Sequence, residues 1–153
     1  NDPTIHLTLA GRCNEDMLQY IHHNAVSIIN NIHFVGIIQP EDLPAFASQF
    51  DVGMAIELDV PENRDICLTN KIFTYLLAGN AIILTNTSMQ QIFNEEFKIG
   101  EIFCTTKLES LIDRINLFKI NEYLNNQKVA NYLLAKGQLN WETESVKLIN
   151  IIS

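Results

Sequence analysis

The sequence predicts an α/β fold: a doubly wound parallel sheet of about five strands with helices on both faces. Short apolar segments alternate along the chain with segments whose apolar residues recur at helical spacing. Turn residues such as Gly11, Gly36 and Asn86 follow the strand-like segments. The chain has 153 residues, the usual size of one domain, so we expect residues 1–153 to form a single domain.

The first third of the chain predicts three strands and two helices. The first strand alternates apolar and polar residues and stops at Gly11, and Asn14 is a good cap for the helix that follows. Pro40 and two acidic residues suit the first turn of a short helix. The expected elements are a strand at 5–10, a helix from 14 to about 29, a strand at 32–35, a short helix from 40 and a strand at 52–56.

The rest of the chain predicts a long loop, two strands and several helices. Residues 58–68 are polar, contain Pro61 and have no sustained period, which is typical of a loop. The clearest helix runs from the capping residue Thr69 to Gly79. We expect Trp141 to anchor the last helix against the body. The other expected elements are strands at 81–84 and 101–104 and helices at 88–93, 108–118, 121–135 and 141–152.

Composition and charge exclude several classes of partner. The net charge of −8 disfavours nucleic acid and anionic lipid surfaces, and no apolar stretch is long enough to cross a bilayer. The three cysteines are scattered and lack metal-site spacing, which favours a reducing compartment and a cytoplasmic protein. We assign no role to His22 and His23, we expect His33 to be structural, and we expect neither a metal ion nor a cofactor.

Candidate site residues come from the carboxyl ends of the strands, where open α/β sheets bind ligands. The sequence has neither a GxGxxG motif nor a P-loop. Lys71 lies in the first turn of the helix that begins after Thr69, where backbone N–H groups and the helix dipole favour an anion; the alternative is that Lys71 points into water. Glu57 could accept hydrogen bonds from sugar hydroxyls or be an ordinary surface acid, and Arg12 could reach a phosphate or be a solvated turn residue.

The string NKIFTYLLAGNAIILT, with LAGR, IHFVG, PEDL and NWE elsewhere, resembles the carboxyl-terminal half of family-four glycosyltransferases of the GT-B fold. The resemblance implies a Rossmann-like domain that binds a UDP- or GDP-sugar and transfers a hexose with retention, without a metal ion. It implies that a glycan or glycolipid acceptor binds in an amino-terminal domain, and that a longer protein is cytoplasmic or peripheral at the inner membrane. The resemblance places the base near Gly36, Ile37 and Ile38, and the ribose and diphosphate near the helix that contains Asn70, Lys71 and Thr74. By their position at strand ends, Gly11, Arg12 and Glu57 complete the set of candidate donor-site residues.

The sequence departs from the family pattern at two carboxylates, because Ile66 and Thr74 stand where the family has glutamates. The acceptor domain and the first strand–helix unit of the donor domain are not in this sequence, so we expect a fragment that is inactive alone. Five strands could close up in the order 2-1-3-4-5, and exposed sheet edges could support a dimer. The alternatives are a non-catalytic relative and a flavodoxin-like or receiver-like module, although no acidic pair follows the first strand.

Overall fold

The computed structural model describes residues 2–152, and the chain divides into two compact units at Leu43. The N-terminal unit extends to Leu43 and the C-terminal unit starts at Pro44. Each unit contains parallel strands joined by helices, so the predicted α/β class with a parallel sheet and flanking helices is confirmed.

The N-terminal unit is a single strand–helix–strand crossover. Its elements are β1 (Leu7–Ala10), α1 (Glu15–Asn24), the 3₁₀ helices η1 (Val26–Asn31) and η2 (Pro40–Asp42), and β2 (Ile32–Val35). Strands β1 and β2 pair in parallel. The Asn14 side chain caps α1 by accepting a hydrogen bond from the Met17 backbone N–H at 2.9 Å, as predicted. The predicted helix continues past α1 only as the 3₁₀ turn η1, a segment rich in β-branched residues that disfavour an α-helix.

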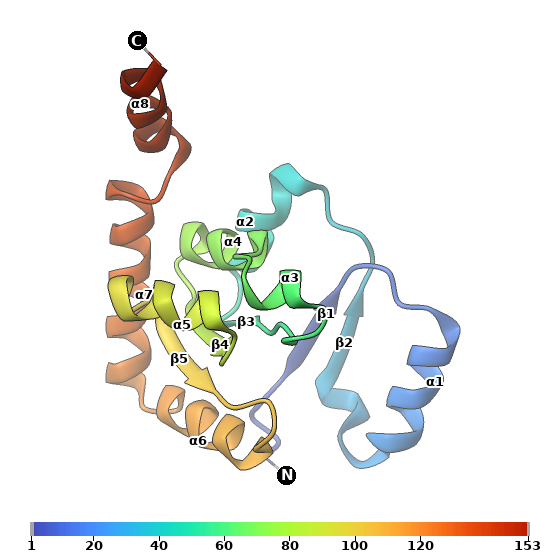
Figure 1. Cartoon of the computed structure of the whole chain (residues 1–153). Helices are drawn as coiled ribbons and strands as arrows, with labels where there is room; N and C mark the ends of the chain where they lie inside the picture. Colours follow the sequence, from blue (N-terminus) through green and yellow to red (C-terminus); the bar gives the residue numbers. More distant parts are fainter. Residues whose placement is uncertain (1, 153) are drawn as a thin grey trace. The chain divides into compact units, whose positions relative to one another are not determined.

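The C-terminal unit contains a three-stranded parallel sheet in the order β3-β4-β5 (Figure 1). The strands are β3 (Val52–Ala55), β4 (Ala81–Thr85) and β5 (Gly100–Phe103). Every residue of the central strand β4 is buried. Because both faces of β4 are covered, its sequence AIILT has no polar face, as is usual for a strand in a parallel sheet.

Helices cover both faces of this sheet. The helices packed against it are α4 (Asn70–Ala78), α5 (Ser88–Phe97), α6 (Leu108–Phe118) and α7 (Asn121–Gly137). The chain also has the helices α2 (Leu43–Ala47), α3 (Glu62–Asp65) and α8 (Trp141–Ile152). On one face Ile82 and Leu84 pack with Ile72 and Leu76 of α4. On the other face Ile83 packs with residues of α6, and Figure 1 shows α4 and α6 on different sides of the sheet.

Two expectations need correction. The five strands form two sheets, so the order 2-1-3-4-5 is realised only as β2-β1 and β3-β4-β5, and the described residues contain no pairing of β1 with β3. Strand β1 is exposed or half-buried throughout, although three of its four residues are apolar. Trp141 does not anchor the last helix, since it is 71% exposed; it is the first residue of α8, whose apolar residues Val146, Ile149 and Ile151 are also exposed.

Candidate functional site

The site is centred on Glu57, which follows β3 at the carboxyl edge of the C-terminal sheet. Its side chain is 7% exposed, and its Oε1 lies 2.5 Å from the Nζ of Lys71. The same ammonium donates a hydrogen bond to the Ile56 carbonyl at 3.2 Å. The Lys71 side chain is 47% exposed, so one partner of this ion pair is buried and the other reaches solvent.

The surroundings of Glu57 favour its charged form. Burial raises the pKa of its carboxyl, but the hydrogen bond and the charge of Lys71 lower it, with help from Thr69 and Arg64, so the pKa lies below its ordinary value of 4.5. The Thr69 hydroxyl contributes without forming a well-oriented hydrogen bond, because its oxygen is buried without a partner among the described residues. The carboxylate is therefore held as an anion beside a cation that reaches solvent.

The first turn of α4 presents free backbone N–H groups beside this ion pair. Thr69 is at the N-cap position, but its side chain makes no capping hydrogen bond, contrary to what the sequence suggests. Within the described part of the chain, no side chain accepts a hydrogen bond from the backbone N–H of Asn70 or Lys71. Gly79 ends the helix in the left-handed conformation, as predicted (φ 70°). The N-terminus of α4 is thus available to an anion.

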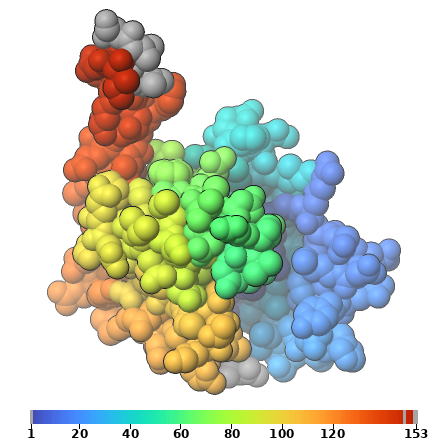
Figure 2. Space-filling view, viewed as in Figure 1, coloured from blue at the N-terminus to red at the C-terminus, as the bar shows by residue number. Residues whose placement is uncertain are grey.

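The neighbouring helix α5 differs, because a protein carboxylate already occupies its N-terminus. Oδ1 of Asp65, the last residue of α3, accepts a hydrogen bond from the Ser88 backbone N–H at 2.8 Å. Hydrogen bonding from the Ser88 hydroxyl, and then from its backbone N–H, lowers the pKa of Asp65. In the space-filling view the green segment that contains α3 lies against the yellow-green start of α5 (Figure 2). Of these two helix starts, only that of α4 lacks a carboxylate cap.

Two buried polar residues support the end of β3. Gln90 of α5 donates from Nε2 to the Ala55 carbonyl at 3.0 Å and accepts at Oε1 from the Thr85 backbone N–H at 2.8 Å and its hydroxyl at 3.1 Å. The Thr85 hydroxyl in turn accepts from the Glu57 backbone N–H at 3.1 Å. These hydrogen bonds tie the chain entering the site to the last residue of β4.

The polar edge continues to the end of β5. Asn86 Oδ1 accepts a hydrogen bond from the Thr105 backbone N–H at 3.0 Å. Ser110 of α6 accepts from the Cys104 backbone N–H at 2.9 Å, and a hydrogen bond with the Thr106 hydroxyl lowers the pKa of the Cys104 thiol. All three strands of this sheet therefore end in hydrogen-bonding residues, which is where such sheets bind ligands.

The structure brings together the four predicted site residues of the C-terminal unit. Glu57 and Lys71 form the ion pair, Asn70 is exposed in the first turn of α4, and Thr74 is half-buried one turn further along. The position of Lys71 in the first turn of α4 predicted an anionic ligand that compensates its charge. In the structure the compensating anion is the protein's own Glu57.

The other predicted residues belong to the N-terminal unit and gather at the ends of its two strands. Gly11, in the left-handed region with φ 130°, donates its backbone N–H to the carbonyls of Val35 and Gly36, both at 3.1 Å. Arg12 and Ile37 are exposed, and Ile38 is half-buried. Gly11 and Gly36 thus lie side by side within this unit.

Sequence reasoning missed the supporting residues of the site. Gln90 is in a helix whose pattern gives no sign that one polar side chain is completely buried, and Thr85 reads only as the end of a strand. Asp65 and Arg64 lie in a segment that the sequence predicts as a loop, whereas the structure has the short helix α3 there. A polar residue directly after a wholly apolar strand was the available signal for Thr85.

Comparisons with known proteins support a glycosyltransferase-like fold. The structure resembles a crystal structure of WaaG, "a glycosyltransferase involved in lipopolysaccharide biosynthesis", with a TM-score of 0.66 and 12% sequence identity. The alignment covers 87% of this chain and 34% of the WaaG chain, so this chain spans about one third of that protein's length. No protein-family model matches the sequence, and no curated protein matches it. No helix among the described residues has the length and apolar character needed to cross a membrane.

Replacing Lys71 with methionine is expected to lower the free energy of unfolding at neutral pH, because it leaves the buried Glu57 carboxylate unpaired. A depressed pKa in the folded state means that Glu57 stabilises the fold above pH 4.5 and loses this contribution as the pH falls through its folded pKa. In urea unfolding, the difference in free energy of unfolding between the unmodified chain and Lys71→Met should therefore shrink below pH 4.5. The control is Lys147→Met, which breaks the exposed pair with Glu144 and should change little at either pH. A difference independent of pH would contradict this role of the ion pair.

Proposed function

We propose that this chain is the sugar-nucleotide-binding, carboxyl-terminal part of a family-four glycosyltransferase of the GT-B type. In the longer protein it would help transfer a hexose with retention to a glycan or glycolipid acceptor, in polysaccharide or glycoconjugate assembly. Support comes from the likeness in fold to WaaG and from the motif around NKIFTYLLAG. The observation that carries the proposal is the uncapped N-terminus of α4 with Lys71 in its first turn, at the carboxyl edge of a parallel sheet.

The diphosphate of a UDP- or GDP-sugar would bind at the first turn of α4. The backbone N–H groups of Asn70 and Lys71 would donate to phosphate oxygens, and the Lys71 ammonium would supply positive charge without a metal ion. A lysine suits this role, because its flexible stem lets the ammonium contact both the Glu57 carboxylate and a phosphate. Glu57 would then accept hydrogen bonds from hydroxyls of the sugar, and the Thr74 hydroxyl would contact the ribose.

Within the N-terminal unit, the strand-end residues Gly36, Ile37 and Ile38 would hold the base, and Gly11 and Arg12 are the further proposed donor contacts of that unit. The acceptor would bind to a separate amino-terminal domain of a longer, cytoplasmic or membrane-peripheral protein. Exposed strand edges would be the surface for any dimer. We propose that residues 1–153 work as one donor domain and that transfer requires the rest of the protein.

A non-catalytic binding domain is the second candidate, and one feature favours it. Thr74 and Ile66 replace both carboxylates of the family pattern, and Ile66 is 56% exposed. A hydroxyl cannot offer the two acceptor oxygens of a carboxylate, and an isoleucine offers none. Such a domain would bind a nucleotide or its sugar without supporting transfer.

Titration calorimetry with UDP-glucose and GDP-mannose tests the donor site. One donor should bind the chain, and Lys71→Ala should weaken its binding by about tenfold or more, because hydrogen bonds to charged groups contribute about 1.5–3 kcal/mol. Lys147→Ala, which removes another exposed, ion-paired lysine, should bind as the unmodified chain does. Binding that survives Lys71→Ala unchanged would show that the phosphates lie elsewhere. Absence of binding to every sugar nucleotide would overturn the proposal.

A further inference from the structure

We infer that Thr85 and Gln90 are positioning residues for Glu57: they fix the backbone at the end of β3 so that the carboxylate meets Lys71. The geometric part stands on hydrogen bonds within the C-terminal unit. Its consequence for a ligand rests on the proposed function, in which Glu57 and Lys71 contact the donor. Thr85 and Gln90 cannot themselves contact a donor, because neither reaches solvent.

Strand β3 stops pairing with β4 just before Glu57. The last paired residue of β3 is Ala55, opposite Leu84. Beyond it, the Glu57 backbone N–H has the Thr85 hydroxyl as its partner. The Thr85 side chain of β4 therefore continues the hydrogen bonding where the backbone pairing of β3 and β4 ends. It fixes the position of the chain at Glu57.

The Thr85 hydroxyl is itself held in one orientation. It donates to Gln90 Oε1 at 3.1 Å, so its proton is committed and its lone pairs face the Glu57 N–H. Gln90 cannot rotate freely, because its Nε2 donates to the Ala55 carbonyl and its Oε1 also accepts from the Thr85 backbone N–H. Both residues have no exposed surface, so water does not compete for these bonds.

Only the carboxylate end of the Glu57–Lys71 pair is buried. Glu57 is 7% exposed and its backbone is tied to Thr85, whereas the Lys71 side chain is 47% exposed on a flexible stem. A ligand anion can therefore draw the ammonium outward while the carboxylate stays in place. Without the hydrogen bond between the Glu57 N–H and the Thr85 hydroxyl, Glu57 could move with Lys71. The carboxylate would then no longer be a fixed hydrogen-bond acceptor for the ligand.

The test measures the titration of the Glu57 carboxyl by carbon-detected NMR in the whole chain. Thr85→Val keeps the shape and removes the hydroxyl, and Thr85→Ser restores the hydroxyl without the methyl group. Thr87→Val is the matched control: Thr87 is also buried, but its hydroxyl has no partner among the described residues. Gln90→Met is a second way to break the support, in case Thr85→Val does not fold.

We expect Glu57 in the unmodified chain to titrate below 4.5. Its midpoint should shift upward in Thr85→Val and in Gln90→Met, and should return to the starting value in Thr85→Ser and stay there in Thr87→Val. A purely structural role predicts lower stability of Thr85→Val with an unchanged Glu57 midpoint, and that result would overturn the inference. If the midpoints move as expected but no sugar nucleotide binds the unmodified chain, the proposed function fails and the positioning role stands.

Discussion

Gly100→Ala should destabilise the C-terminal unit by about 3 kcal/mol or more, because an added methyl group has no room in the sheet. A Cβ built on Gly100 would lie 2.1 Å from the Ile82 carbonyl oxygen and 2.9 Å from its carbon. These are backbone atoms of the central strand, directly opposite in the β4–β5 register, so no side chain can rotate away to relieve the clash.

The surroundings of Gly100 prevent β5 from moving aside. Asn94 of α5 donates to the Gly100 carbonyl and accepts from its N–H, both at 3.0 Å, so a shift of the strand would break these bonds as well. Ile82 has no exposed surface and is packed within one of the two cores. Relief of the clash therefore costs either strand pairing or core packing.

Urea unfolding of Gly100→Ala and Gly137→Ala would check this expectation. Gly137 ends α7 and has no atom within 4 Å of the position of an added Cβ. Its replacement should be neutral or stabilising by up to about 1 kcal/mol, because alanine favours a helix over glycine. Equal stability of the two variants would mean that β4 and β5 are not paired in this register.

The fold could be read largely from local signals, because they coincide with tertiary burial in most elements. Strand β2, helices α6 and α8, and the Gly79 end of α4 lie where the sequence places them. The division into two sheets could not be read, since the period of a strand does not reveal which neighbour it pairs with. The prediction for Trp141 was wrong because large apolar side chains are buried on average, whereas residue 141 lies on an exposed helix.

The candidate site could be predicted only in its outline. The rule that ligands bind at the carboxyl ends of parallel strands led to Glu57, and the helix start led to Lys71. That the two form an ion pair depends on side-chain reach across the end of the sheet, which residue spacing does not specify. Long-range hydrogen bonds also escaped prediction; Gln90 bonds to Ala55, 35 positions away in the sequence.

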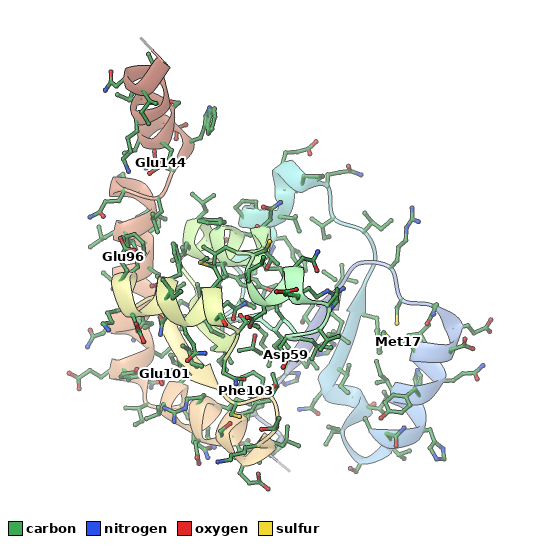
Figure 3. The ribbon with its side chains drawn as sticks, viewed as in Figure 1. Met17, Asp59, Glu96, Glu101, Phe103 and Glu144 are labelled. Atoms are coloured by element: carbon green, nitrogen blue, oxygen red, sulfur yellow. The ribbon has the colours of Figure 1, made fainter. Side chains whose placement is uncertain are left out.

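The interactions of Tyr123 also could not be predicted from the sequence, because they form only in the folded chain. Its hydroxyl donates to Glu101 of β5, and Arg114 of α6 donates to the same carboxylate at 2.8 Å. Figure 3 shows Glu101 on β5 beside α6. Burial and the Glu101 carboxylate raise the pKa of Tyr123 to about 12. The cluster of Glu101, Arg114 and Tyr123 joins β5, α6 and α7. The spacing of these residues in the sequence does not predict it.

Asn131→Leu should cost about 2–6 kcal/mol of unfolding free energy, although leucine is similar in size to asparagine. The buried Asn131 amide of α7 donates to the Asn80 carbonyl at 2.7 Å and to the Ile99 carbonyl at 2.8 Å. These carbonyls immediately precede β4 and β5, so one side chain ties α7 to the start of two strands. Leucine would remove both bonds and leave polar backbone atoms against an apolar group, which costs about 1–3 kcal/mol for each.

The comparison that isolates this effect is Asn126→Leu on the same helix, at an exposed position, which should change stability by less than about 0.5 kcal/mol. Asn131→Asp adds a second test. An ionised aspartate has no proton to donate to either carbonyl, so we expect this variant to be the least stable at neutral pH and to regain part of its stability in acid, when the protonated carboxyl can donate one bond. Urea unfolding at neutral and at acidic pH measures the stability of each variant. If Asn131→Leu were as stable as Asn126→Leu, the two carbonyls would have other partners and α7 would be held by apolar packing alone.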